Sequence, residues 1–135
     1  MTLIQEVWLI AETQKVRGAS SDSKRMELEI RAAGQVVKRK LGDAPGDNYQ
    51  PGRADIWQFD MADEQISQQD LEPGSFRLTN PSRDGWLPKS FFIIGKLENG
   101  EFVVLLGNPN WPAKWFDSDS SSGQQSSTSW PLNER

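Results

Sequence analysis

FFIIGKLENGEFVVLL, residues 91–106, contains two apolar runs joined by a short polar segment with Asn-Gly at its centre. Asn-Gly between two such runs is a strong signal of a β-hairpin, because a type I′ turn needs positive φ at both of its central residues. We therefore predict strands over 91–97 and 102–106, with a type I′ turn between them.

Short segments with a strand pattern also precede this hairpin. Met26, Leu28 and Ile30 alternate with acidic residues, which is typical of a half-buried strand. The predicted strands before the hairpin cover residues 4–13, 26–30, 36–41, 57–61 and 76–78. Short strands separated by turn residues, without a long helix, are typical of a sandwich. We predict an all-β fold, an antiparallel two-sheet β-sandwich of about eight strands.

The chain has the length of one domain. Its 135 residues, of which 36% are hydrophobic and 25% charged, have a folded composition. Residues 118–129 include seven Ser and no hydrophobic residue, so we expect a flexible loop there. The apolar run Val7–Ala11 is too short for a signal peptide or a membrane span. We expect a single domain over 1–135, without a classical signal peptide or transmembrane segment and cytoplasmic by default.

Two residue types are absent, and their absence excludes several kinds of chemistry. Without Cys there is no thiolate nucleophile, and without His there is no Ser-His-Asp triad or His-ligated zinc. Any metal would be a hard ion on oxygen ligands. The net charge of −4 gives no electrostatic attraction to nucleic acid, so we expect no nucleic-acid partner.

Oxygen-rich residues are concentrated in three loops, at 19–22, 43–48 and 82–85. In a sandwich, loops of alternate strands can gather at one end. Carboxylates and carbonyls brought together there would suit Ca²⁺, which takes about six to eight oxygen ligands. Asp, Asn, Ser and Gly are also the residues that turns use for conformational reasons alone. From composition, the turn interpretation is the simpler of the two.

The stretch Leu41–Met61, LGDAPGDNYQPGRADIWQFDM, resembles the central segment of PLAT domains, the lipoxygenase-type C2-like β-sandwiches. It is especially similar to the C-terminal domains of the clostridial alpha-toxin phospholipases. The shared pattern is an acidic residue, Pro-Gly, an aromatic residue, Gly-x-x-Asp and an aromatic strand. Residues 19–23 resemble the family's Ala-Gly-Thr-Asp signature, and residues 84–88 resemble its later Asp-aromatic-Pro segment.

The resemblance implies a calcium site and names its ligands. The matching positions are Ser20, Ser21, Asp43, Gly46, Asn48 and Asp84. Three substitutions depart from the family pattern: Ser20 replaces Gly, Ala44 replaces an Asn ligand, and Asn48 replaces an Asp. Because fewer charged ligands remain, we expect weak binding, with a Kd of about 10⁻⁴–10⁻³ M or above.

The resemblance also implies a non-catalytic module that binds membrane lipid or a protein partner through the loops at one end. Trp86 and Leu87 lie in a turn, where an exposed pair would suit insertion at a membrane interface. The alternative is that Trp86 folds over the sandwich end as a plug. We assign Trp8 and Trp57 to the core, because both lie within strand patterns. The basic run Lys38–Lys40 could contact acidic headgroups or protect an edge strand.

Three other functions remain open. A carbohydrate-binding β-sandwich would need a flat row of exposed tryptophans. A stand-alone structural or protein-interaction domain would need no calcium. A hydrolase with two carboxylates could use Asp55 with Asp60, or Asp84 with Asp117, but no spacing selects a pair. We expect no enzyme activity.

Overall fold

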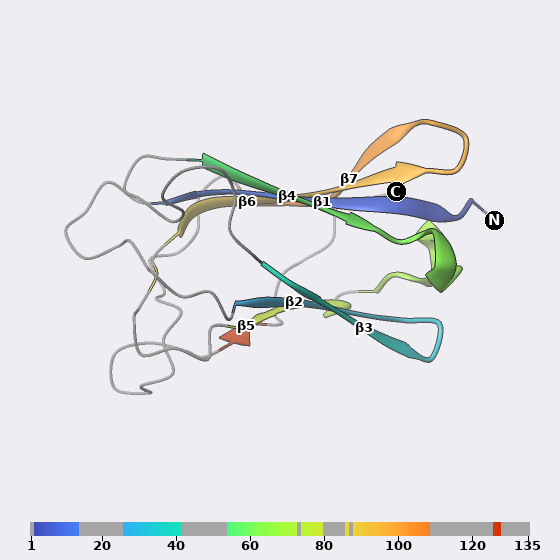
Figure 1. Ribbon diagram of the computed structural model, residues 1–135, viewed down its shortest axis with the longest axis horizontal. Helices are drawn as coiled ribbons and strands as arrows, with labels where there is room; N and C mark the ends of the chain where they lie inside the picture. The colour runs from blue at the N-terminus through green and yellow to red at the C-terminus, as the bar shows by residue number, and fades with distance from the viewer. Residues whose placement is uncertain are drawn as a thin grey trace.

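Eight β-strands and two short 3₁₀ helices make up the described part of the chain (Figure 1). The structure is a computed structural model, and it describes residues 2–13, 26–41, 54–72, 74–79, 86, 88–108 and 126–127. The elements are β1 (Ile4–Thr13), β2 (Glu27–Ala32), β3 (Gln35–Lys40), β4 (Ala54–Asp60), η1 (Ala62–Glu64), η2 (Gln68–Asp70), β5 (Phe76–Thr79), β6 (Pro88–Leu97), β7 (Phe102–Asn108) and β8 (Ser126–Ser127). None of the described helices has the length and apolarity needed to cross a bilayer.

The strands form two sheets that face each other (Figure 1). The first sheet has the order β4-β1-β6-β7, and the second has the order β3-β2-β5-β8. All the strand pairs are antiparallel. The predicted antiparallel two-sheet β-sandwich of about eight strands is therefore confirmed. β3 lies at an edge of its sheet, as its run of cations predicted.

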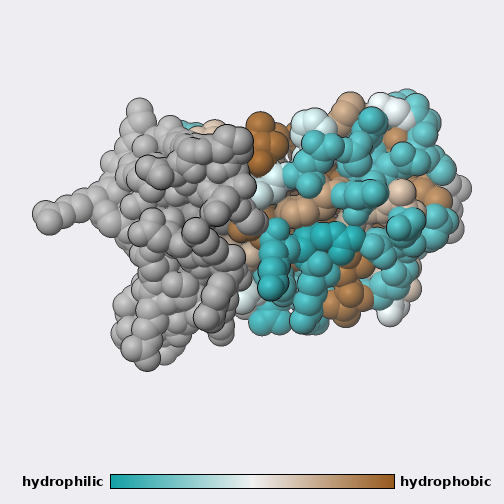
Figure 2. All heavy atoms as spheres, viewed as in Figure 1, coloured by the Kyte–Doolittle hydropathy of each residue, from teal (hydrophilic) through white to brown (hydrophobic). Residues whose placement is uncertain are grey.

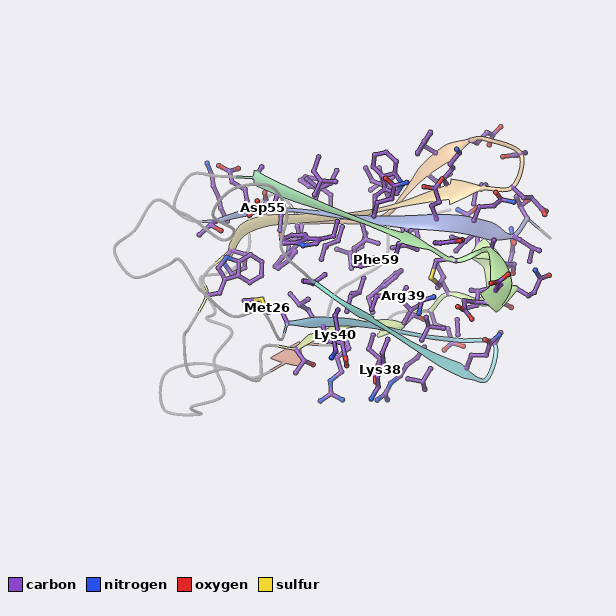
Figure 3. All side chains as sticks on the ribbon, in the orientation of Figure 1. Met26, Lys38, Arg39, Lys40, Asp55 and Phe59 are labelled. Carbon is purple, nitrogen blue, oxygen red and sulfur yellow. The ribbon has the colours of Figure 1, made fainter. Side chains whose placement is uncertain are left out.

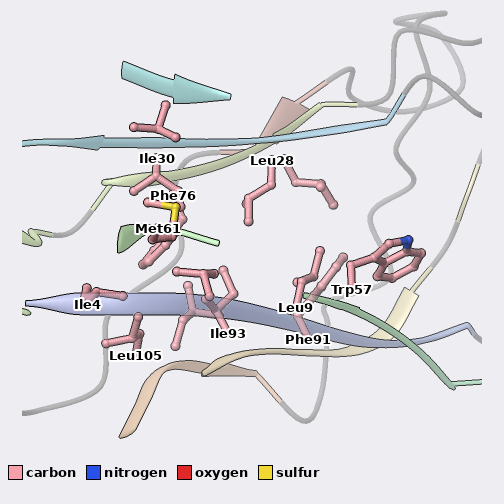
Figure 4. Close-up of a cluster of buried hydrophobic side chains, with 14 of the residues drawn as sticks. Ile4, Leu9, Leu28, Ile30, Trp57, Met61, Phe76, Phe91, Ile93 and Leu105 are labelled. Atoms are coloured by element: carbon pink, nitrogen blue, oxygen red, sulfur yellow. The ribbon is translucent and has the colours of Figure 1, made fainter. Parts of the chain in front are cut away.

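The core lies between the two sheets and follows the period-2 pattern of the strands (Figure 4). Val7, Leu9 and Ala11 of β1 are each at most 1% exposed. Leu28 of β2 and Phe76 of β5 reach toward them from the second sheet (Figure 4). Each fully buried large apolar side chain contributes roughly 1.5–3 kcal/mol relative to its exposed state. Burial of these alternating residues is what fixes the strand register.

The β6–β7 hairpin forms where the sequence predicts it, but its turn is of another type. The Gly100 N–H donates to the Leu97 carbonyl (2.9 Å), and the Leu97 N–H donates to the Glu101 carbonyl (2.8 Å). Gly100 has a φ of 88°, while Asn99 keeps a negative φ. This is a type I turn followed by a left-handed glycine, so the predicted type I′ turn is wrong. The Asn99 side chain accepts a hydrogen bond from the Glu101 N–H (3.0 Å), which favours the observed conformation.

A turn with positive φ at both central residues does occur, at Ala33 and Gly34 between β2 and β3. Their φ angles are 51° and 73°, and Ala32 pairs directly with Gln35. These features define a type I′ hairpin. Alanine is an unusual residue in this conformation, because its Cβ crowds the backbone when φ is positive.

The serine-rich stretch at 118–129 is only partly described. Ser126–Ser127 form β8 and pair with Leu78 and Thr79 of β5. The prediction of a flexible loop is therefore wrong for these two residues. Backbone hydrogen bonds to a sheet edge require no apolar side chain, so composition does not exclude a strand there. The rest of 118–129 lies outside the described residues.

Candidate functional site

One end of the sandwich carries the strand ends that flank the three oxygen-rich loops. In the first sheet, Glu12 of β1 pairs with Ala54 of β4, and the next residue pairs with Pro88 of β6. In the second sheet, Glu27 of β2 pairs with both Lys40 of β3 and Thr79 of β5. These strand ends lie on the left in Figure 1. We call this the loop end. The strand ends that flank the three loops thus lie at the same end of the sandwich.

The predicted calcium ligands themselves cannot be placed. Ser20, Ser21, Asp43, Gly46, Asn48 and Asp84 all lie outside the described residues, as does Leu87. Among the described residues, no group of three or more acidic side chains is close enough to hold a metal ion. The calcium site therefore stays a prediction that the loop end makes possible.

Trp86 lies at the loop end and is fully buried, at 0% exposure. Its indole N–H donates to Thr13 Oγ1 at 2.8 Å. Its ring meets Phe91 edge to face, with centroids 5.3 Å apart and planes at 87°. A buried indole needs an acceptor for its N–H, and Thr13 supplies one. The prediction that Trp86 is an exposed membrane contact is therefore wrong, and its role as a plug of the sandwich end is confirmed.

The carboxylates of β4 do not form a catalytic pair. Asp55 is 3% exposed and lies on the inner side of β4, near the loop end (Figure 3). Asp60 is exposed and lies on the outer side, at the other end of the strand. Five residue steps along the strand place them about 16 Å apart. The two carboxylates of a glycosidase lie about 5–9.5 Å apart, so Asp55 with Asp60 is excluded as such a pair.

The outer side of the second sheet concentrates positive charge. It carries four cations and two anions, a net charge of +2 (4 − 2) in a chain whose total is −4. We call this the cationic face, and its charged residues are Lys38, Lys40, Arg31, Arg77, Glu27 and Glu29. Figure 3 shows the nitrogen atoms of this face pointing away from the first sheet.

The cationic face is organised around Glu29, which is only 7% exposed. Lys38 of β3 and Arg77 of β5 are its direct neighbours across the sheet. The Arg31 Nε lies 2.9 Å from its carboxylate. Arg39 points to the other side of β3 and forms an ion pair with Glu64 of η1 at 2.6 Å. The basic run of the sequence is thus divided, and Lys38 and Lys40 face solvent.

The outer side of the first sheet carries a central group of apolar side chains to which all four strands contribute. We call it the apolar face, and it consists of Trp8, Ile10, Ile56, Phe92, Ile94, Phe102 and Val104. The Trp8 and Phe102 rings meet edge to face, with centroids 5.7 Å apart. The assignment of Trp8 to the core is wrong, because Val7 and Leu9 on either side of it point inward. Trp57 is buried, as predicted.

The described surface does not favour sugar binding. Of the described tryptophans, only Trp8 lies on an outer side, so the described tryptophans form no flat row there. A hollow of about 390 Å³ lies at the β2–β3 hairpin, beside Arg31, Glu72 and Ser75. Its described lining contains no aromatic ring on which a sugar could stack.

Two facing sheets of four strands each place this protein in the class of antiparallel β-sandwiches, and its fold is PLAT/C2-like. The resemblance predicted from the sequence is confirmed at the level of the fold by two solved structures. The alpha-toxin from Clostridium absonum matches with a TM-score of 0.72 and 18% identity, over 93% of this chain and 31% of the toxin chain. The alpha-toxin from an avian strain of Clostridium perfringens matches with a TM-score of 0.68 and 21% identity, over 85% and 30%.

These similarities concern only part of each toxin. The chain spans about a third of the toxin length, and identity at this level shows a shared fold alone. No protein-family model and no curated protein matches the sequence.

Proposed function

We propose that this chain is a non-catalytic module that binds membrane lipid through its loop end, with Ca²⁺ bridging the acidic loops to anionic headgroups. The observation that carries the proposal is the convergence of the strand ends that flank all three oxygen-rich loops. A bound Ca²⁺ would be the largest local charge in the site and would supply the positive charge that an acidic chain lacks. The fold shared with part of two alpha-toxins supports the same function.

The cationic face supports an anionic lipid in particular. Lys40 pairs with Glu27 in the last row of the second sheet before the loop end, and Lys38 lies in the next row. A bilayer that contacts the loops would therefore also come close to these two lysines. Cations near an anionic leaflet each contribute about 1 kcal/mol of attraction. The cationic face should give a contribution to binding that needs no calcium.

Calcium titration of chelator-stripped protein tests the loop end. We expect binding with a Kd of about 10⁻⁴–10⁻³ M, because few charged ligands remain. A ligand that binds only the folded state raises the melting temperature, so calorimetry and thermal melting should agree. Asp43→Ala and Asp84→Ala should each abolish both effects. Calcium should also promote co-sedimentation with phosphatidylserine vesicles. No heat and no melting shift at several millimolar calcium would overturn the calcium site.

Binding to phosphatidylserine vesicles in chelator tests the cationic face. The double variant Lys38→Gln with Lys40→Gln should bind about thirtyfold more weakly than the wild type, because two headgroup attractions are lost. Lys96→Gln is the control for the removal of one charge, since Lys96 lies on the first sheet at the end away from the loop end. A loss in Lys96→Gln as large as that in Lys38→Gln alone would show that net charge, not the cationic face, governs binding.

A second candidate function, protein interaction without calcium, is favoured by the apolar face. Phe102 and Ile56 on that face are 56% and 54% exposed. A continuous surface of exposed large apolar side chains is typical of an interaction site.

A further inference from the structure

The apolar face departs from the usual pattern of an antiparallel sheet. Such a sheet normally packs one side on the core and leaves the other side polar. Here β1 and β6 are apolar on both sides, and the rows Trp8–Ile94 and Ile10–Phe92 cross the centre of the outer side. Val104 on β7 is 44% exposed next to them. In Figure 2, hydrophobic atoms reach the surface on the upper side of the sandwich, where the first sheet lies.

Charges border the apolar face in a regular arrangement. At one border, Glu6 of β1 lies 3.4 Å from Lys96 of β6. At the other border, Glu12 of β1 lies 3.8 Å from Lys89 of β6. The acid is on β1 and the base is on β6 in both cases. The charges of β1 and β6 balance at each border, and Asp60 of β4 adds one acid in the row of Glu6.

The geometry points to a second copy of this chain as the occupant of the apolar face. We propose a dimer whose two-fold axis runs parallel to the strands, between β1 and β6. This axis lays β1 of one copy over β6 of the other at the same height along the strands. Two sheets packed in this way lie about 10 Å apart, as they do inside a sandwich. The interface is isologous, because the same surface is used on both sides.

The charges become complementary under this axis. Glu6 lies over Lys96 of the partner subunit, and Glu12 lies over Lys89 of the partner subunit. In the centre, Ile10 lies over Phe92 of the partner subunit. On the two central strands each of these acids thus meets a base, and the apolar rows of β1 and β6 meet each other. On the outer strands, Asp60 lies over Phe102 of the partner subunit and Gln58 lies over Val104 of the partner subunit. This pairing follows because, within the two central strands, the acids are on β1 and the bases are on β6.

The shape is complementary at the edges of the sheet. Ile56 on β4 is 54% exposed and protrudes in the row of Ile10 and Phe92. Gly107 occupies the same row on β7 and carries no side chain. The two-fold axis places Ile56 over Gly107 of the partner subunit. A Cβ at Gly107 would already lie 3.4 Å from the Phe92 ring, so the glycine keeps this part of the face low.

Sedimentation in chelator, from micromolar to millimolar protein, tests the dimer independently of calcium and lipid. We expect a concentration-dependent monomer–dimer equilibrium. Ile56→Lys should raise the dimer Kd about 100-fold, because each interface would bury two lysines. Val36→Lys is the matched control: Val36 is 56% exposed on the edge strand of the second sheet, and its replacement should leave the Kd unchanged. Thermal melting of both variants establishes that they fold.

Charge reversal tests the direction of the two-fold axis. Lys96→Glu and Glu6→Lys should each weaken self-association, because each puts like charges opposite one another in both halves of the interface. An equimolar mixture of the two variants should dimerise again, since each Glu6 then faces a Lys96 and each introduced Lys faces an introduced Glu. A wild type that stays monomeric, or a mixture that does not recover, overturns the proposal. So does an Ile56-dependent partition of monomers into uncharged vesicles, which would make lipid the occupant.

Discussion

Replacing Trp86 with alanine is expected to lower the free energy of unfolding by about 3–5 kcal/mol, the range found for large aromatic residues in cores. The indole is 0% exposed and lies edge to face on Phe91, so its removal leaves a cavity at the loop end. Edge-to-face aromatic pairs add about 0.5–1.5 kcal/mol beyond the burial of their surface. Chemical denaturation in urea would measure the change.

The Trp86→Phe variant separates packing from hydrogen bonding. It keeps an aromatic ring but removes the N–H that donates to Thr13 Oγ1, and Thr13 is itself 0% exposed. Leaving a buried hydroxyl without its hydrogen-bond donor lowers the free energy of unfolding by about 1–3 kcal/mol. Thr13→Val in the Trp86→Phe background should recover part of this loss, because no polar atom then stays unpaired. A Trp86→Ala protein within 1 kcal/mol of the wild type would show that the ring does not close the core.

The strands were predictable because one face of each is buried. Alternation of Met26, Leu28 and Ile30 identified β2, and the apolar runs around Asn99-Gly100 identified β6 and β7. Period-2 patterning reflects the geometry of a single strand, so it needs no knowledge of the neighbours. The turn type was not predictable in the same way. Asn can adopt either a positive or a negative φ. At Asn99, the hydrogen bond from the Glu101 N–H to the Asn side chain favours the negative φ.

The surfaces were less predictable, because they depend on which strands become neighbours. Lys38 and Arg77 are far apart in the sequence, yet both are direct neighbours of Glu29 in the sheet. No local pattern contains that information. Trp8 could have been assigned correctly, since Val7 and Leu9 already fix the inward side of β1. Trp86 belongs to no strand pattern, and only its contacts with Thr13 and Phe91 show that it is buried.

Gly95→Val is expected to lower the free energy of unfolding by about 3 kcal/mol, at the upper end of the usual cost of overpacking a core. Gly95 faces the core from β6, and a Cβ there would lie 3.0 Å from Leu105 Cδ1 and 3.3 Å from Leu105 Cγ. The β6–β7 pairing shifts register between Ile93 and Ile94. This bulge turns both Leu105 and Leu106 inward, at 3% and 1% exposure, so the Leu105 side chain fills the space that glycine leaves.

A double-mutant cycle with Leu105→Ala checks that mechanism. The single Leu105→Ala change should cost about 2–5 kcal/mol through the cavity that it leaves. Valine at position 95 can occupy that cavity. The double variant should therefore lose less free energy of unfolding than the two single variants lose together, by about 1 kcal/mol or more. Gly107→Val is the matched control, because a Cβ at Gly107 on the outer side of β7 has no neighbour closer than 3.4 Å. In dilute protein, Gly107→Val should lower the free energy of unfolding only slightly, since valine has a high propensity for strands. Strict additivity at Gly95 and Leu105 would mean that the glycine serves the backbone of the bulge and not the side chain beside it.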